Sequence, residues 1–315
     1  MATLTDSLKG LLPAQLRNSN LRTEYLTFFL LVLPSVFQFT LWIYWPFVQS
    51  IYLSFTNWNP LNPVKSFVGP DNYVRLFSSP LFWQVLFNTV VFTVGVLAIR
   101  LTLSLGLAVL LNQQLAARGF WRLVYFSPHI TTSAAMALVW LTIYEPTRGP
   151  LQAIFEAFGA SFPDVLSSTA LALPALMLVD IWKGLGYSTI VFLAALQGVD
   201  REMKDAAAVD GANGWQLFRH ITIPLLAPTI FFLLVISIIG SFQAFNHIYT
   251  MNIAASQSLG GPLGTTRTVS IFMFDQLYNQ NRAGYATSIA ILLSLIIFAL
   301  TLFQFRFFER GGEGA

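Results

Sequence analysis

Three charged residues lie inside long apolar stretches of the sequence: Arg100, Asp180 and Lys183. A charge inside a bilayer costs on the order of several kcal/mol unless it is paired, so such residues are functional candidates by default. Asp180 and Lys183 stand at positions i and i+3 of one helix, so they share a face and can pair. We further expect Arg100 to bond to Asp180. The set fits either a structural ion cluster that fixes the register of the helices or a polar wall along a path through the membrane.

Aromatic residues and glycines follow Asp180 closely. Trp182, Gly184 and Tyr187 lie on the same apolar stretch. We expect the glycines to loosen the helix and to expose carbonyls beside aromatic rings, an arrangement that suits the CH faces and hydroxyl edges of a sugar. The alternative is ordinary helix packing, because small residues are common where membrane helices meet.

Hydroxyl and amide side chains mark a later apolar stretch. Ser237 and Ser241 share one helix face at i, i+4 spacing, and Gln243 extends the polar group. His247 is predicted to lie near the outer edge of the membrane, as an interfacial hydrogen-bonding group rather than a ligand. The histidines are far apart in sequence and the chain has no cysteine, so the sequence predicts neither a metal site nor a disulfide.

The elements that must position these side chains are membrane spans. Hydrophobic residues make up 55% and charged residues 10% of the chain, against about 25% charged residues in soluble domains. The mean hydropathy is +0.64, and several apolar runs are long enough to cross roughly 30 Å of hydrocarbon. The sequence therefore predicts an all-α membrane protein with six transmembrane helices, at Leu26–Phe47, Leu86–Leu111, Leu123–Tyr144, Leu171–Leu196, Leu225–Tyr249 and Tyr285–Phe305.

The orientation of the spans follows from the Lys and Arg residues outside them, which favour the cytoplasmic side. The segments on the side of the N-terminus hold more of these residues than the opposite loops. We therefore place both termini in the cytoplasm, with 1–25 as an interfacial segment, 26–308 as the membrane domain and 309–315 as a tail. The expected outer segments are 48–83, 145–168 with a short helix, and a polar loop at 251–284.

Residues 197–226 form a polar loop between the fourth and fifth spans, on the cytoplasmic side. Asp200 is expected to cap a first short helix, and Gly211 to stop it in the left-handed conformation. A second helical piece is expected to follow and to end at Pro224. A slim helix with acids at both ends is shaped to be held in a groove of another protein. The alternative is an ordinary cytoplasmic loop with a solvated helix.

This loop resembles the EAA loop of the membrane subunits of ABC importers, which is the coupling helix that docks into the cytoplasmic ATPase subunit. The leading Glu of the family pattern is Asp205 here, which keeps the charge but shortens its reach. The positions that match the pattern are Asp205, Ala206, Ala207, Asp210, Gly211, Ala212, Phe218 and Pro224.

Two further stretches carry the same resemblance. Phe67–Tyr73 is similar to the F-x-G-x-x-N-Y stretch of sugar-type permeases. Trp182, Gly184 and Tyr187 match a Trp-x-Gly-x-x-Tyr stretch that lines the substrate site in maltose-type permeases. In that family the region of the fifth span also faces the central cavity, which would place Ser237, Ser241 and Gln243 along the substrate path.

The resemblance implies a type I, MetI-like importer permease in the bacterial inner membrane. Such a subunit alternates access to translocate a sugar, oligosaccharide, glycosylated polyol or glycerol-phosphate. The implied partners are a second homologous permease subunit, two ATPase subunits and an extracytoplasmic solute-binding protein, and no nucleic acid is expected. The sequence contains no phosphate-binding G-x-x-x-x-G-K-[ST] motif, so we expect ATP-Mg on the ATPase subunits and no cofactor on this chain.

An ion-coupled secondary transporter is the alternative, with Asp180, Lys183 and Arg100 as its relay. The lack of an evident inverted repeat weighs against it. A membrane-embedded hydrolase has less support, because the sequence contains no H-E-x-x-H, no cysteine and no serine elbow motif.

Overall fold

The structure is a computed structural model that describes residues 19–62, 64–113, 118–200, 203, 206, 207 and 209–312. This part of the chain is helical and contains no strand, apart from an isolated antiparallel β-bridge between Thr56 and Phe67. The chain divides into two compact units, Met1–Leu53 and Ser54–Ala315. The predicted interfacial segment 1–25 lies largely outside the described residues, and Asp205 of the predicted coupling helix is also among the residues left out.

The first unit is built from one long apolar helical run. It consists of α2 (Ser19–Phe39), the π-helical turn η2 (Thr40–Tyr44) and α3 (Trp45–Ser54). Thr23–Ser54 is apolar and long enough to cross a membrane, so the predicted first span is confirmed as a helix that is longer than expected at both ends. The π-turn ends two residues before Pro46, which lacks the N–H that a regular helix would use at this point.

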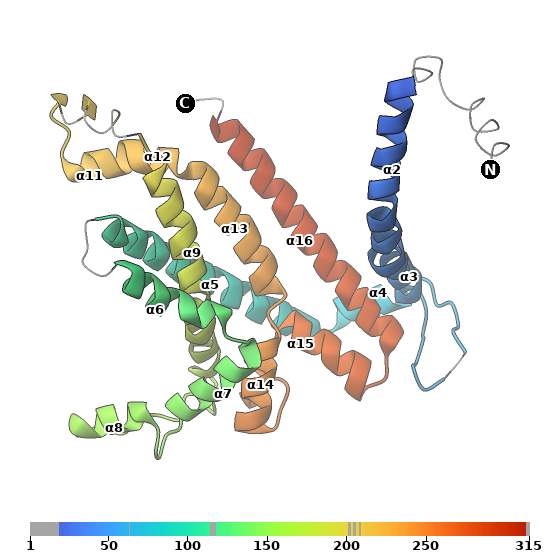
Figure 1. Ribbon diagram of the computed structural model, residues 1–315. Coiled ribbons are helices and arrows are strands. Elements are labelled where there is room, and N and C mark those ends of the chain that lie inside the picture. The colour runs from blue at the N-terminus through green and yellow to red at the C-terminus, as the bar shows by residue number, and fades with distance from the viewer. Residues whose placement is uncertain are drawn as a thin grey trace. The chain divides into compact units, whose positions relative to one another are not determined.

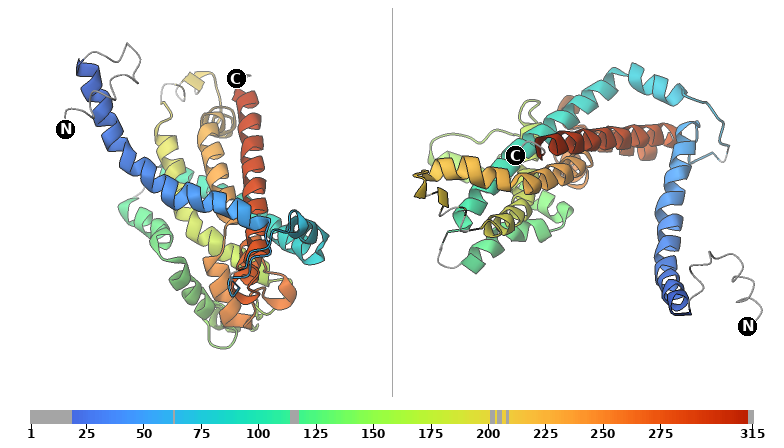
Figure 2. Two further views of the ribbon diagram at one scale, coloured as in Figure 1. Left: turned by 90° about the vertical axis from the view of Figure 1, so that its right-hand side faces the viewer. Right: turned by 90° about the horizontal axis from the view of Figure 1, so that it is seen from above.

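The second unit holds the remaining helices (Figure 1). In chain order these are α4 (Asp71–Ser78), α5 (Pro80–Leu111), α6 (Arg118–Ile130), α7 (Ser133–Ile143), α8 (Pro150–Ala157), α9 (Ala172–Gln197), α11 (Gly214–Leu217), η3 (Phe218–Thr222), α12 (Ile223–Leu225), α13 (Ala227–Phe242), α14 (Asn246–Ser256), η4 (Pro262–Gly264), α15 (Val269–Phe274), η5 (Asp275–Asn279) and α16 (Ala283–Gly312). Within the unit, α5 packs along α9, α14 packs on α7, and α13 lies beside α16 (Figure 2).

Three of the predicted spans in this unit correspond to continuous helices. The second span is α5, which starts at Pro80 rather than Leu86, because proline fits the first turn of a helix where its missing N–H is not needed. The fourth span is α9, within one residue at each end. The sixth span is α16, which runs on to Gly312, so the expected polar tail begins as helix. The expected short helix in the loop 145–168 is α8.

The expectation of one continuous third span is wrong. Two helices, α6 and α7, replace it, and Thr132 between them is extended, with φ −61° and ψ 141°. Pro128 near the end of α6 removes a backbone donor, which favours a break close by. Among the described residues, five helical runs are long and apolar enough to cross a membrane, and neither α6 nor α7 is one of them.

The fifth span and the loop after it also differ from expectation. The apolar run Ala227–Ser256 is interrupted at Gln243–Phe245, which separates α13 from α14. The predicted polar loop 251–284 is largely helical, because α14 continues to Ser256 and is followed by η4, α15 and η5. Hydrophobic side chains of α15, including Ile271 and Phe272, are buried, so this segment belongs to the packed part of the unit.

The Phe67–Tyr73 stretch builds a clamp at the start of the unit. Gly69 has a φ of +59°, which a residue with a side chain rarely adopts. The buried amide Nδ2 of Asn72 donates hydrogen bonds to the carbonyls of Ser54 and Thr56, both at 2.8 Å. The Tyr73 hydroxyl donates to Oγ of Ser54, also at 2.8 Å. The stretch therefore fastens α4 to the chain that leaves α3.

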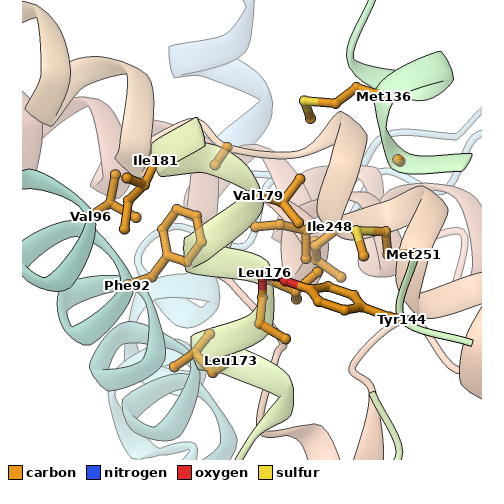
Figure 3. Close-up of a cluster of buried hydrophobic side chains, with 14 residues drawn as sticks. Phe92, Val96, Met136, Tyr144, Leu173, Leu176, Val179, Ile181, Ile248 and Met251 are labelled. Atoms are coloured by element: carbon orange, nitrogen blue, oxygen red, sulfur yellow. Dashed lines mark hydrogen bonds between the residues drawn. The ribbon is translucent and has the colours of Figure 1, made fainter. Parts of the chain in front are cut away.

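A buried apolar cluster surrounds the segment of α9 that carries Asp180. The cluster contains fully buried side chains from α5 (Phe92 and Val96), α9 (Leu176) and α14 (Ile248) (Figure 3). Met136 of α7 also belongs to it and is 1% exposed. Three helices thus meet around one stretch of α9. Close packing of this kind holds the polar side chains next to it in fixed positions.

Candidate functional site

Arg100 and Asp180 form an ion pair between α5 and α9. Nη1 of Arg100 lies 3.2 Å from Oδ1 of Asp180, and the two side chains are 11% and 18% exposed. The predicted bond between these residues is therefore confirmed. Each charge offsets the desolvation cost of the other, which permits both to lie within helices long enough to cross a membrane.

Two glycines on α9 let neighbouring backbone and side chains approach the helix. A Cβ atom at Gly184 would lie 2.6 Å from Nη1 of Arg100, so glycine provides the space for the guanidinium. A Cβ atom at Gly186 would overlap the backbone carbonyl of Tyr125, on α6. The expectation that these glycines loosen the helix is wrong, because α9 is continuous across both. The small-residue packing alternative describes them better.

His247 is the third member of the polar cluster. It is 5% exposed, and its Nε2 lies 3.6 Å from Oδ2 of Asp180, beyond hydrogen-bonding distance. The prediction of an interfacial histidine near the outer edge is therefore wrong. The break at Gln243–Phe245 separates α14 from α13, and α14 carries His247 to α9. Spacing along the sequence does not reveal this approach.

Lys183 has a different partner from the one expected. Its Nζ donates a hydrogen bond to Oγ of Ser133, in the first turn of α7. The carboxylate of Asp180 is engaged by Arg100 and faces His247 instead. Lys183 is half-buried, so its side chain is not sealed within the protein interior.

Aromatic rings flank Lys183 on α9. The Trp182 ring packs edge-on to Trp140 of α7, with centroids 5.6 Å apart, and remains 39% exposed. The Tyr187 ring stacks on His129 of α6, with centroids 5.1 Å apart. Trp140 and His129 lie on the helices that replace the predicted third span, and their contribution was not identified from the sequence. Trp182 and Tyr187 thus lie before and after Lys183 on α9 and pack against α7 and α6.

The three polar residues predicted to line the fifth span are only partly brought together. Ser237 and Ser241 are both buried on α13, and no hydrogen-bond partner of the Ser241 hydroxyl occurs among the described residues. Gln243 is exposed and ends α13, so it does not share their environment. In the described part of the chain, no hydrogen bond or ion pair joins these three residues to Arg100 or Asp180.

The loop 197–226 contains the predicted glycine stop. Gly211 has a φ of +80°, and the N–H of Ala212 donates to the carbonyl of Ala207 at 2.9 Å, the bond that characterises a Schellman ending. Ala206 and Val209 are exposed, and the Val209 side chain is 89% exposed. The helical turn before Gly211 therefore presents an apolar side chain outward.

The second helical piece begins with a capping box. Oδ1 of Asn213 accepts from the N–H of Gln216 at 2.9 Å, and the Gln216 side chain accepts from the Asn213 N–H at 2.8 Å. Phe218 begins the π-helical turn η3, and Trp215 beside it is 65% exposed. The piece ends at Leu225, one residue beyond the expected Pro224.

A family model described as "Binding-protein-dependent transport system inner membrane component" matches residues 17–311. The chain belongs to this family. It is therefore a membrane-spanning permease component of a bacterial ABC importer, as the resemblance of its loop indicated.

Individual members of the family align with this permease over most of its length. The probable ABC transporter permease protein YurN of Bacillus subtilis (strain 168) is 31% identical over 289 residues, which are 90% of this chain and 97% of that protein. The diacetylchitobiose uptake system permease protein NgcF of Streptomyces coelicolor is 29% identical over 313 residues, which are 95% of this chain and 87% of that protein.

A solved structure agrees with the fold of the permease. A chain in the crystal structure of a bacterial ABC transporter involved in the import of the acidic polysaccharide alginate superimposes with a TM-score of 0.80 at 23% identity. The match covers 92% of this chain and 97% of that chain. It confirms the all-helical, MetI-like fold. The comparisons do not support the ion-coupled secondary transporter.

Proposed function

We propose that this permease forms one half of the membrane channel of an ATP-driven importer for a carbohydrate-type solute. A second, homologous permease subunit would complete the channel, and a solute-binding protein would deliver the solute from outside. The named relatives support the solute class, since one takes up diacetylchitobiose and the structural neighbour imports a polysaccharide. The chain itself would bind no nucleotide, and two ATPase subunits would hold ATP-Mg.

The observation that carries the proposal is the exposed apolar surface of the loop 206–220. Val209 and Trp215 are 89% and 65% exposed on opposite sides of the Gly211 stop. An apolar helix end bounded by two fixed caps is suited to a groove on another protein. This loop and the C-terminal end of α16 lie at the same end of the second unit, whereas α8 lies at the other end (Figure 1). We therefore place the loop and the C-terminal end of α16 in the cytoplasm, with the loop docked on an ATPase subunit.

The mechanism would be alternating access. Closure of the ATPase subunits on ATP would push the loop, and the helices would switch between two packings, since tightly packed cores change between discrete states. The solute path would be lined on α9 by Trp182, Lys183, Gly184 and Tyr187. On the fifth span it would be lined by Ser237 and Ser241 of α13 and by Gln243 at the end of that helix. The Arg100–Asp180 pair would hold α5 and α9 in register beside this path.

The docking role is tested by a pair of proline substitutions in the loop. Gly211→Pro is incompatible with the φ of +80° at this position. Gly214→Pro places the proline at the first position of α11, after an extended Asn213, which is where proline is tolerated. We expect Gly211→Pro to reach the membrane but to lose stimulation of ATP hydrolysis by the loaded binding protein, and Gly214→Pro to keep it. Normal stimulation in Gly211→Pro would contradict docking through this loop.

A further inference from the structure

Lys183 is a cation in a membrane-spanning helix whose contacts supply no negative charge. Its described hydrogen bond goes to the Ser133 hydroxyl, and the carboxylate one turn away, Asp180, is held by Arg100 at 3.2 Å. Ser133 lies in the first turn of α7, where the helix dipole is positive. The contact therefore fixes the position of the ammonium without compensating its charge, and an ammonium can donate two more hydrogen bonds.

The charge balance of the surrounding helices leads to the same conclusion. Asp180 is the single acidic residue in α5, α6, α7, α9, α13 and α14, all of which the structure describes. Arg100 and Lys183 are the cations near it. Apart from the histidines, the cluster has one more cationic than acidic side chain. An unbalanced charge at membrane depth is costly unless water or an anion reaches it.

The surroundings of Lys183 are those of a binding surface rather than of a sealed core. Lys183 and Tyr187 stand at i and i+4 and share a helix face. The neighbouring Trp182 ring is 39% exposed, and Nε1 of Trp140, which packs edge-on to it, is buried with no hydrogen-bond partner in the described part of the chain. Aromatic faces beside a cation match a sugar ring that carries an acidic substituent.

We propose that Lys183, positioned by Ser133 and flanked by Trp182 and Tyr187, forms a subsite for an acidic group on the transported carbohydrate. The group is a carboxylate, as in a uronic acid, or a phosphate monoester. Arg100 is excluded from this role because its guanidinium is committed to Asp180. The inference rests on the proposed function, since it requires that this face of α9 borders the solute path.

The test measures solute binding to the purified permease–ATPase complex in nanodiscs. The binding protein is left out, so that any preference among solutes comes from the site in the membrane. The radiolabelled probes are trigalacturonate, glycerol 3-phosphate and neutral maltotriose. We expect the complex to hold one of the two acidic probes about tenfold more tightly than maltotriose, the ratio that one charge-assisted hydrogen bond supports. The acidic probe that is preferred identifies a carboxylate or a phosphate as the recognised group. Equal binding of all three probes would overturn the proposal.

The variants Lys183→Met and Lys183→Arg test the residue itself. Methionine keeps the length of the side chain and removes the charge, so we expect the acidic probe to lose its advantage of about tenfold over maltotriose. Arginine should retain the preference. If Lys183→Met keeps the preference, the proposal is wrong. If it also lowers the yield of the complex, the lysine is a structural partner of another subunit.

A further variant is available where Lys183→Met does not assemble. Ser133→Ala removes the hydroxyl that positions the ammonium, and we expect it to weaken the acidic preference several-fold without loss of maltotriose binding. An unchanged preference in Ser133→Ala would contradict the positioning role. Copurification of the ATPase is recorded for every sample, so failure of the importer assignment shows as a missing ATPase, whereas failure of the subsite shows as an intact complex without acidic preference.

Discussion

Gly184 and Arg100 occupy complementary positions on two helices. A Cβ atom at Gly184 would lie 2.6 Å from Nη1 and 2.7 Å from Cδ of Arg100. The guanidinium reaches Asp180, four residues before Gly184 on α9, only because this position has no side chain. A glycine that looks like a point of helix flexibility is therefore a packing residue that admits the ion pair.

We expect Gly184→Ala to displace the Arg100 guanidinium and to weaken its ion pair. Overpacking of this kind costs about 1–3 kcal/mol, and the transport rate should fall with it. The measurement is the thermal midpoint of the purified complex together with solute uptake. Gly106→Ala on α5 is the matched control, because a Cβ atom there meets nothing within 4 Å. If the two variants behave alike, Gly184 has no special role in admitting Arg100.

The ion pair could be predicted from the sequence, whereas its third member could not. A charge in an apolar stretch must find a partner, and Asp180 was the single acid within the predicted spans. His247 reaches Asp180 because the chain breaks at Gln243–Phe245, where the residues remain apolar or neutral. Hydropathy does not detect such a break. The approach of Gly184 and Gly186 to their neighbours depends on which helices pack together, and a single sequence does not specify this.

Removal of either partner of the Arg100–Asp180 pair should cost more than removal of both. Arg100→Met leaves the carboxylate with only His247 at 3.6 Å, and Asp180→Asn leaves the guanidinium without its counter-charge. Each single variant should destabilise the complex by roughly 3–5 kcal/mol, as for other buried pairs, and the double variant by less than either single variant. Thermal unfolding in detergent is measured for the wild-type complex, the two single variants and the double variant, which together form a double-mutant cycle. Additive losses would show that the two side chains do not interact.

Asn72 should stabilise the start of the second unit. Its amide donates to the Ser54 and Thr56 carbonyls at 2.8 Å each and is 7% exposed, so Asn72→Ala removes both bonds from a buried position. We expect a loss of about 1–3 kcal/mol and faster proteolysis of the 54–70 segment. Asn62→Ala is the control, because its exposed Oδ1 accepts one local hydrogen bond from the N–H of Val64. Equal protease sensitivity of the two variants would contradict the clamp.

The long apolar helices were the most predictable elements, and the breaks between them the least. The fourth span was placed within a residue because its apolar run is bounded by polar loops on both sides. The third span was predicted as one helix from its apolar composition, although Pro128 within it favours a break close by. The Gly211 stop was predictable because left-handed helix ends strongly favour glycine, whereas the Asn213 capping box that follows it was overlooked.

Val209 provides the sharpest test of where the ATPase binds. Its side chain is 89% exposed and is therefore available for contact with another protein. A charge placed there would be desolvated in the complex without a partner. We therefore expect Val209→Glu to reduce copurification of the ATPase by tenfold or more, which corresponds to about 1.4 kcal/mol or more of docking energy.

The matched control is Phe158→Glu, at the end of α8. Phe158 is 85% exposed, and α8 lies at the opposite end of the second unit from the loop (Figure 1). The substitution makes the same chemical change at a similarly exposed apolar position. ATPase retention should therefore remain at the wild-type level in Phe158→Glu and be lost in Val209→Glu. Equal retention in both variants would mean that the exposed side chain of Val209 is not part of the docking surface, and loss in both would mean that the ATPase does not discriminate between the two ends of the helices.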